Sequence, residues 1–314
     1  LNEPQRGYIG VKDLRSLYGV LDVGIVPTPW QSIQLGAGYP QIVKQLERTV
    51  FGTVNKGTVT LNKEKRSAWL PDRECVWKQN SVWDLDKDGQ PVLFKPDYFH
   101  KVNGREVDFV RDYLTPFIKK MISSVRSVKP GWIGFIESEV NNYPPHWQEA
   151  ADLNLVNVPH WYDGPLLYLK KFFSFIGFNE ITGQVIFGQQ NVEKAYKAQL
   201  AEIKQLTRER LGNIPTLIGE FGIPYDMENK KAYKNGRFQN HVKAMDRSMR
   251  TMEANLLNYT IWNYTSDNTN ARGDLWNDED LSIFSRDQQT DKTDTNSGGR
   301  ALQAVIRPFP TALA

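Results

Sequence analysis

Helix and strand patterns alternate along most of this chain, and that alternation restricts the possible folds more than any other feature. From Val107 onward, segments with apolar residues at helical spacing are separated by short, continuous apolar runs. Short strands joined by helices are typical of a parallel sheet, because parallel neighbours need long crossover connections. With 314 residues, the chain is long enough for one large domain or two small ones. We therefore expect an α/β fold.

Four buried strands are predicted, at residues 132–136, 155–158, 216–219 and 257–262. The helices between them are indicated by apolar spacing and by end signals. One apolar helix face is formed by Phe109, Tyr113, Phe117, Met121 and Val125, and another by Val242, Met245, Met249 and Met252. Right-handed crossovers would curve the four strands into an arc, which is half of an eight-stranded barrel.

The longest predicted helix has clear end signals. Asn191 is interpreted as its N-cap, and basic side chains occupy its last turn before Leu211. Gly212 follows directly and is the expected stop. A final helix is predicted between Gly299 and Ile306.

Residues 51–97 interrupt the alternation. The turn Asp86-Lys87-Asp88-Gly89 lies between apolar and aromatic residues and predicts a β-hairpin. In a barrel, this insertion would cross the active-site face. Residues 84–89 also match the first six positions of an EF-hand calcium loop, but Lys95 stands where a bidentate Glu is required, so a simple turn is favoured.

Residues 266–298 read as a polar loop. We interpret the acidic group Asp274, Asp278, Glu279 and Asp280 as solvated, with Trp276 as a residue that lines the cleft. Residues 287–299 are expected to be mobile.

Composition excludes several classes of function. The net charge is +3, from 39 basic and 36 acidic residues without a long basic run, which argues against nucleic acid as a partner. The single Cys75 excludes an internal disulfide and a cysteine-based zinc site. No apolar run approaches the roughly 20 residues that span a membrane. The chain begins without Met or a signal peptide, which says little about its compartment because the true N-terminus can lie upstream. The location is left open, with an intracellular one, in the cytoplasm or vacuole, favoured.

Two glutamates stand in short motifs far apart in the sequence. Glu3 lies in Asn2-Glu3-Pro4, and Glu220 lies in Gly219-Glu220-Phe221-Gly222, directly after an apolar run. A retaining glycosidase needs one carboxyl that gives a proton to the leaving oxygen and a second that attacks the anomeric carbon. Both motifs fall where a strand meets a loop, which is where barrel enzymes hold their catalytic residues.

An ordered set of motifs resembles glycoside hydrolase family 5. The resemblance is closest to its endoglycoceramidase-related branch, especially the fungal glucosylceramidase and steryl β-glucosidase group. The set comprises Asn2-Glu3-Pro4-Gln5-Arg6-Gly7-Tyr8-Ile9-Gly10, Lys95-Pro96-Asp97-Tyr98-Phe99, His160-Trp161-Tyr162-Asp163-Gly164, Gly219-Glu220-Phe221-Gly222 and Trp262-Asn263-Tyr264. It implies a (β/α)8 TIM barrel, of which the chain carries the end of strand 4 through helix 8. Residues 1–310 would then be a partial catalytic barrel, and residues 311–314 a tail at the start of a β-sandwich domain.

The resemblance also implies roles for individual residues. Glu3 would be the acid/base and Glu220 the nucleophile. Asn2 would bind the sugar 2-hydroxyl, and no metal or organic cofactor is expected. The other substrate-binding residues that it implies are His160, Tyr162, which would touch the nucleophile, and Trp262, which would form a platform under the sugar.

Plainer interpretations of these residues stay open. His160 could be a structural histidine in the core, and Trp262 could be ordinary packing. Many aromatic residues fall in segments expected at the barrel rim, where they would form either a slot for a lipid aglycone or packing under long loops. These are Trp30, Tyr39, Trp77, Trp83, Tyr98, Phe99, Trp147, Phe172, Phe173, Phe175 and Phe178. Residues 172–178 could also make transient contact with a membrane surface.

We therefore expect a retaining β-glucosidase that acts on a glucosylated lipid, either a steryl glucoside or a glucosylceramide. An endoglycoceramidase or β-glucanase of the same family is the alternative within this chemistry. An inactive lipid- or glycan-binding fragment is the alternative from another class. Exo or endo cleavage and the oligomeric state remain open, and a half barrel by itself is expected to pack poorly or to associate through its strand edges.

Overall fold

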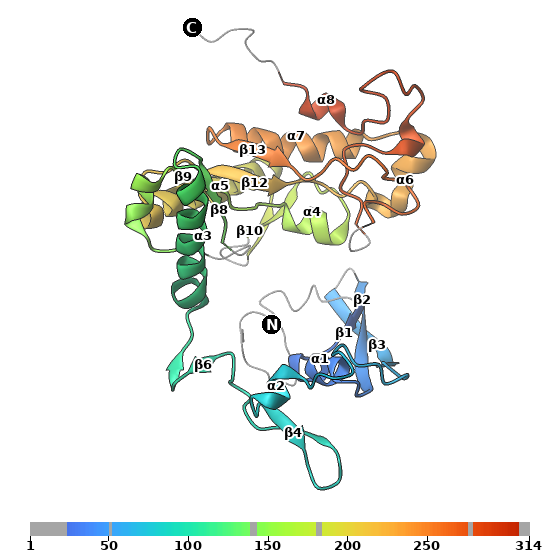
Figure 1. The fold of residues 1–314 in the computed structure, drawn as a ribbon. Coiled ribbons are helices and arrows are strands. Elements are labelled where there is room, and N and C mark those ends of the chain that lie inside the picture. Colours follow the sequence, from blue (N-terminus) through green and yellow to red (C-terminus); the bar gives the residue numbers. More distant parts are fainter. Residues whose placement is uncertain (1–23, 50–51, 139–142, 180–183, 276–278, 308–314) are drawn as a thin grey trace. The chain divides into compact units, whose positions relative to one another are not determined.

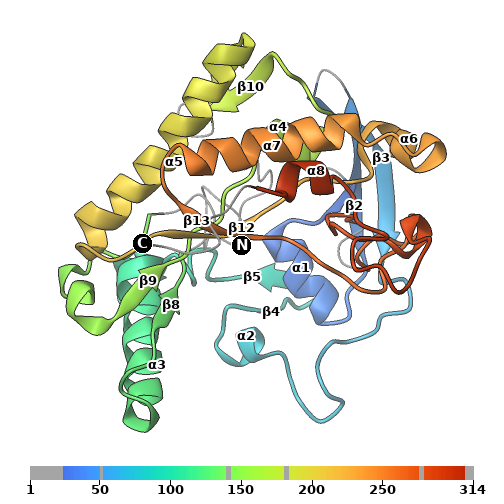
Figure 2. The same cartoon turned by 90° about the horizontal axis from the view of Figure 1, so that it is seen from above.

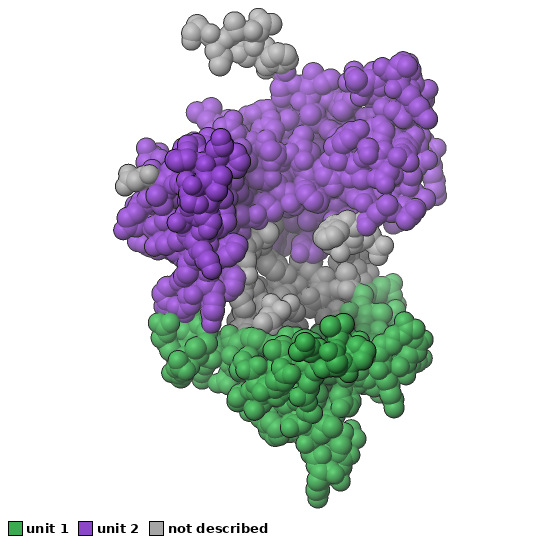
Figure 3. Space-filling view, viewed as in Figure 1, with its two compact units in different colours: residues 1–108 green, residues 109–314 purple. Residues whose placement is uncertain are grey.

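The computed structural model describes residues 24–49, 52–138, 143–179, 184–275 and 279–307. The chain divides into two compact units, Leu1–Asp108 and Phe109–Ala314, which Figure 3 shows in green and purple.

The first unit contains a three-stranded antiparallel sheet in the order β1-β2-β3. Its strands are β1 Gly24–Val26, β2 Gln41–Thr49 and β3 Gly52–Leu61. Between β1 and β2, helix α1 (Pro29–Gly36) begins with a capping box, in which Thr28 and Gln31 exchange side-chain and backbone hydrogen bonds of 3.0 and 3.2 Å. Sequence reasoning missed the β2–β3 hairpin, which begins before the insertion predicted at residue 51.

The predicted hairpin at residues 86–89 is confirmed. Strands β4 (Trp83–Leu85) and β5 (Pro91–Leu93) pair antiparallel around it. The Asp86 carboxylate accepts hydrogen bonds from the backbone N–H groups of Asp88 and Gln90, at 2.9 and 2.8 Å, so it serves the turn itself. The remaining elements of this unit are α2 Val76–Gln79, β6 Lys101–Val102 and β7 Arg105–Glu106.

Aromatic residues form the core of the first unit. Trp83 is almost completely buried and makes edge-to-face contacts with Trp30 and Tyr39, at ring-centroid distances of 5.9 and 6.0 Å. Trp77 and Phe99 make a similar contact at 6.2 Å. Of the two interpretations of these aromatics, the structure supports mutual packing.

The second unit is built on four parallel strands (Figure 1). They are β8 Gly134–Ile136, β9 Leu155–Asn157, β12 Leu217–Phe221 and β13 Asn258–Ile261. β8 pairs with β9 and β12 with β13, while parallel bridges at Asn157↔Thr216 and His160↔Glu220 join β9 to β12. The four predicted strands and their order along the chain are confirmed.

Helices and one antiparallel hairpin connect these strands. The hairpin pairs β10 (Ile176–Asn179) with β11 (Gln184–Phe187). The helices are α3 Thr115–Val128 with the preceding π-turn Val110–Leu114, the 3-10 helix Gln148–Leu153, α4 Gly164–Leu169, α5 Gln189–Leu211, α6 Met227–Asn235, α7 Gln239–Glu253, the 3-10 turn Arg286–Gln288 and α8 Leu302–Val305. In Figure 2, α5 and α7 lie next to each other, with α8 against α7. No helix in the described ranges is long and apolar enough to cross a bilayer.

The start of α5 differs from its prediction. The helix begins at Gln189, three residues earlier than expected, after Gly188 with φ +95°. Asn191 lies inside the helix, and its side-chain amide donates a 2.8 Å hydrogen bond to the Phe187 carbonyl instead of capping the helix. The predicted stop at Gly212 is confirmed, with φ +76°.

The main core of the second unit lies between α5, α7 and the strands. Met245, Met249 and Met252 of α7 are buried against residues that include Ile218 and Leu200. Ile136 and Trp147 belong to a smaller core, which also includes residues of α3 and the end of α5. By contrast, four apolar residues of β8, its N-terminal flank and α3 are more than half exposed: Trp132, Ile133, Phe135 and Phe117. The strand predicted at 132–136 is therefore buried only at its last residue.

Candidate active site

Chemically capable side chains gather where the four parallel strands end. Glu137 follows β8 directly, His160 follows β9 by three residues, Glu220 lies near the end of β12, and Trp262 follows β13. The carboxyl ends of neighbouring parallel strands meet at one edge of the sheet, which is where α/β proteins place their ligands.

Glu220 is contacted on both carboxylate oxygens. The Tyr162 hydroxyl donates a 2.5 Å hydrogen bond to Oε1, and His160 Nδ1 lies 3.5 Å from Oε2. The backbone supports this arrangement, because the Trp161 N–H donates a 3.0 Å hydrogen bond to the Glu220 carbonyl. With 23% of its side chain exposed, Glu220 is held in one orientation and still reaches the solvent.

Tyr162 is suited to act as a donor. Burial raises the pKa of the phenol well above its ordinary value, and the hydrogen bond to the Glu220 carboxylate raises it further. The hydroxyl therefore stays protonated and donates a hydrogen bond to Glu220. The expectation that Tyr162 touches this glutamate is met in the structure.

His160 lies between two carboxyl groups. Its Nε2 is 3.1 Å from Glu137 Oε1, on the side opposite Glu220. A neutral imidazole can donate to one of these carboxylates, and a protonated one can donate to both. Since it bridges two acids at the strand ends, His160 is not simply a histidine of the apolar core. Sequence reasoning missed Glu137, although its place directly after a predicted strand was a usable signal.

Trp262 lies at the neighbouring strand end, and its N–H donates a 2.8 Å hydrogen bond to the Phe221 carbonyl. Its side chain is 37% exposed, and its peptide bond to Asn263 is cis. The structure thus brings Trp262 to the strand next to that of Glu220, while its role under a sugar stays a prediction. Asn2 and Glu3 lie outside the described residues, so their roles also stay predictions.

Asp163, next to Tyr162, anchors the segment that carries the site. It is buried and paired with Arg247, and it accepts a 2.9 Å hydrogen bond from Tyr196. It also caps α4 by accepting a 3.3 Å bond from the Leu166 N–H. The Arg247 guanidinium lies over the Phe172 ring at 4.7 Å, so Phe172 packs against this ion pair, and both side chains also line a cavity of about 340 Å³.

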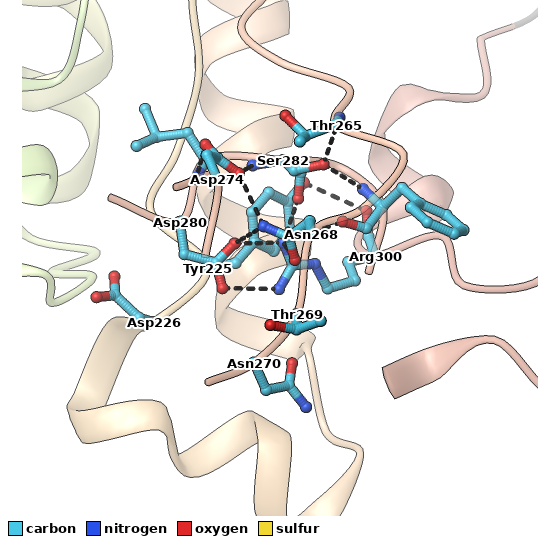
Figure 4. A network of polar contacts seen from close by, with 12 residues as sticks. Tyr225, Asp226, Thr265, Asn268, Thr269, Asn270, Asp274, Asp280, Ser282 and Arg300 are labelled. Atoms are coloured by element: carbon cyan, nitrogen blue, oxygen red, sulfur yellow. Dashed lines mark hydrogen bonds and ion pairs between the residues drawn. The ribbon is translucent and has the colours of Figure 1, made fainter. Parts of the chain in front are cut away.

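The acidic residues of the loop after β13 were expected to be solvated, and the structure differs for two of them. Asp280 is 3% exposed, and the Arg300 side chain is fully buried and pairs with both of its carboxylate oxygens. Asn268 donates to Asp280 and to Asp274, at 2.9 and 2.8 Å (Figure 4). The solvated-loop interpretation of Asp274 and Asp280 is therefore wrong, because both carboxylates accept hydrogen bonds from other protein groups and Asp280 is paired with Arg300. Asp278 and Trp276 lie outside the described residues.

The same network ties the loop to the strand end. Asp274 accepts a 3.0 Å hydrogen bond from the Asn263 side chain and 2.9 and 3.2 Å bonds from the N–H groups of Leu281 and Ser282. Asn263 follows Trp262 directly, so the network fixes the backbone beside that tryptophan. Within the described ranges, no cluster of His, Cys, Asp and Glu is arranged to hold a metal ion.

Comparisons with known proteins point to glycoside hydrolases, although no family model matches the chain. The chain is 33% identical over 341 residues to a glucosylceramidase of Rhizopus delemar, a match that covers 100% of this chain and 50% of the relative. It is 30% identical to the ergosteryl-beta-glucosidase of Saccharomyces cerevisiae over 332 residues, which covers 95% of this chain and 43% of the relative.

A solved structure gives the same result. The crystal structure of Cryptococcus neoformans sterylglucosidase 1 matches with a TM-score of 0.83 and 32% identity, over 99% of this chain and 50% of that one. The curated relatives are glycoside hydrolases. The α/β fold of this chain is shared with the solved sterylglucosidase structure. The chain spans about half the length of the curated relatives it matches.

Proposed function

We propose that this chain supplies the nucleophile and much of the substrate site of a retaining β-glucosidase of the family 5 type, acting on a glucosylated lipid. In this proposal, β8, β9, β12 and β13 are strands 5 to 8 of a (β/α)8 barrel. The observation that carries it is the Glu220 carboxylate, held by Tyr162 and His160 at the carboxyl ends of parallel strands. The similarity to a glucosylceramidase and to an ergosteryl-beta-glucosidase supports the substrate class.

The mechanism assigns two roles to two carboxyl groups. Glu220 attacks the anomeric carbon while Glu3 protonates the glycosidic oxygen, which gives a covalent glucosyl-enzyme and releases the lipid alcohol. Glu3 then removes a proton from water, which attacks the anomeric carbon and frees Glu220. Tyr162 keeps one Glu220 oxygen oriented through both steps, Asn2 binds the 2-hydroxyl, and Trp262 supports the sugar ring.

The test uses the complete open reading frame that contains this chain, assayed with a chromogenic β-glucoside. Glu220→Gln should lower kcat by roughly three or more orders of magnitude, because it removes the nucleophile and preserves the shape of the side chain. Glu149→Gln, at an exposed position of the 3-10 helix Gln148–Leu153, is the matched control and should keep full activity. Normal turnover by Glu220→Gln would refute the proposal.

Azide then tests the retaining mechanism. A Glu220→Gly variant has room for azide in place of the carboxylate, so azide should restore turnover and give the α-glucosyl azide, with inverted configuration. Competition between a steryl glucoside and a glucosylceramide decides which lipid is preferred. A protein that binds these lipids but cleaves no β-glucoside would instead be the inactive binding fragment.

A further inference from the structure

A polar cavity of about 690 Å³ lies beside the chain that continues from β12. This volume is within the range of small-molecule sites and exceeds what one monosaccharide needs. Its charged walls come from the segment after β12, from α6 and from the loop after β13. They are Asp226, Lys230, Arg272, Glu279 and Asp280.

Glu279 is the unusual member of this wall. Its carboxyl has no hydrogen bond or ion pair with any side chain in the described ranges, unlike that of Asp280 next to it. Burial raises the pKa of Glu279, and the negative charges of Asp274, Glu220 and Asp226 raise it further, against the opposing effect of Lys170. The Glu279 charge also acts on the Tyr162 phenol. The cavity therefore lies within electrostatic reach of the proposed nucleophile and its donor.

The backbone around Glu279 is fixed although its carboxyl is unsatisfied. The Asp274 N–H donates a 2.9 Å hydrogen bond to the Glu279 carbonyl, and the Tyr225 N–H donates a 2.6 Å bond to the Asp280 carbonyl. The buried pair of Asp280 with Arg300 holds the adjacent side chain. A carboxyl that is held in place, repelled by its neighbours and left without a partner is prepared for a ligand, not for the stability of the fold.

The surroundings of the cavity carry donors and acceptors together. Lys170 pairs with Asp226 at 2.5 Å, and the second Asp226 oxygen is buried without a hydrogen-bond partner among the described residues. Lys230 donates a 2.7 Å hydrogen bond to the Asn270 carbonyl, and the backbone of residues 228–230 has φ values of +54°, +57° and +60°. Non-glycine residues in this region are strained, a feature that concentrates at binding sites.

The chemistry of the lining restricts the ligand. Lys230 and Arg272 line the cavity together with the acids, and Lys170 acts on Asp226 and Glu279. These cations disfavour a metal ion, and the shortage of apolar side chains disfavours a lipid tail. A group with many hydroxyls can donate to the carboxylates and accept from the cations at the same time. A sugar ring meets both requirements.

We propose that Glu279 is a specificity-determining residue that binds ring hydroxyls of the glucosyl group remote from the cleaved bond. Asp226, which is paired with Lys170, lines the same cavity. This assignment rests on the proposed function, because it places the anomeric carbon at Glu220.

The test uses the protein expressed from the complete open reading frame and compares kcat/KM for a β-glucoside with kcat/KM for its deoxy analogues. Wild type, Glu279→Ala and Glu279→Gln are assayed with a chromogenic β-glucoside and with its 4-deoxy and 6-deoxy analogues. In wild type, loss of the bound hydroxyl should lower kcat/KM about 10- to 100-fold. Glu279→Ala should lower kcat/KM for the unmodified glucoside by a similar factor. For the analogue that lacks the bound hydroxyl, Glu279→Ala should lower kcat/KM little further. Equal losses from Glu279→Ala on all three substrates would overturn the assignment.

Melting temperatures and a control variant distinguish a binding role of Glu279 from a structural role. Glu279→Gln should leave the melting temperature unchanged or raise it, because it removes a repelled charge that has no partner. Asp267→Asn makes the same charge change at an exposed position of the loop after β13 and should alter neither kcat/KM nor stability. A lowered melting temperature for Glu279→Gln together with uniform kinetic losses would mark Glu279 as a structural residue.

Glucose binding distinguishes this assignment from the proposed function. If wild type cleaves no β-glucoside, the proposed function fails, and calorimetry with glucose still tests the cavity. Wild type should then bind glucose about 10-fold or more tightly than Glu279→Ala does. Equal affinities, or no glucose binding by wild type, would overturn the assignment of Glu279.

Discussion

His241 should make the stability of the second unit depend on pH. Its ring is almost completely buried on α7, stacked 5.6 Å from the Tyr225 ring, and its Nε2 lies 2.9 Å from the Tyr225 carbonyl. The carbonyl requires an N–H at Nε2, and the buried Nδ1 has no partner in the described ranges. Burial lowers the pKa of His241 from 6.5 to about 4, and the hydrogen bond to Tyr225 offsets only part of that effect.

The sign of the pH effect follows from proton linkage. Between pH 6.5 and pH 4, the unfolded chain protonates His241 and the folded chain does not, so the free energy of unfolding falls as pH falls. Above pH 6.5, both states are neutral at this residue and its contribution is constant. At about 1.4 kcal/mol per pH unit, lowering the pH from 7 to 5 should remove about 2 kcal/mol, and the full effect by pH 4 is about 3 kcal/mol.

Urea unfolding at pH 7 and pH 5, followed by tryptophan fluorescence, measures this loss. Other acids also titrate, so the decisive quantity is the pH-dependent loss in wild type minus that in His241→Gln, whose amide N–H can replace the donor to Tyr225. His146→Gln, at an exposed position, should retain the full wild-type dependence. The same pH dependence in wild type and His241→Gln would refute the reasoning. An NMR titration of the His241 ring in wild type gives an independent check, and a midpoint near 6.5 would also refute it.

Three further substitutions test the site. Tyr162→Phe removes the donor to the nucleophile and should lower kcat about 10- to 100-fold while the melting temperature changes little, as steady-state kinetics and a thermal melt would show. Arg300→Met leaves the buried Asp280 charge unpaired and should destabilise the protein by about 3–5 kcal/mol in urea unfolding; adding Asp280→Asn should recover part of that loss. Gly222→Ala would place a Cβ 2.1 Å from the Trp262 carbonyl oxygen and should cost about 1–3 kcal/mol and most of the activity, whereas an active, equally stable variant would contradict the close approach of these strand ends.

The parallel strands could be predicted because their signals are local. The apolar run before Glu220, for example, is bounded by a Pro on one side and Gly-Glu on the other, and β12 forms there. The start of α5 was misplaced because Gly188 and Asn191 both suit a helix start, and only the contact from Asn191 to the Phe187 carbonyl decides between them. The β2–β3 hairpin was missed because its long polar strands carry little alternation of apolar residues.

The contacts of the candidate site were predicted only in part. Tyr162 and Glu220 are brought into contact as expected, since Tyr162 follows β9, Glu220 lies near the end of β12, and bridges join these two strands. Glu137 was overlooked because a single acid after a strand has no distinguishing neighbour in sequence. Its significance appears only when His160 from the next strand reaches it.

Glu279 and Asp280 show where reasoning from sequence ends. The two acids are adjacent in one polar loop, and composition gives both the same interpretation. Arg300, twenty positions later, folds back and neutralises Asp280, together with Asn268. Glu279 has no such pair in the described ranges: it lines the cavity, where Asp274 and Glu220 repel its charge and Lys170 offsets that repulsion only in part. Because long-range packing alone decides which acid is paired, one carboxyl stabilises the loop and its neighbour stays available to a ligand.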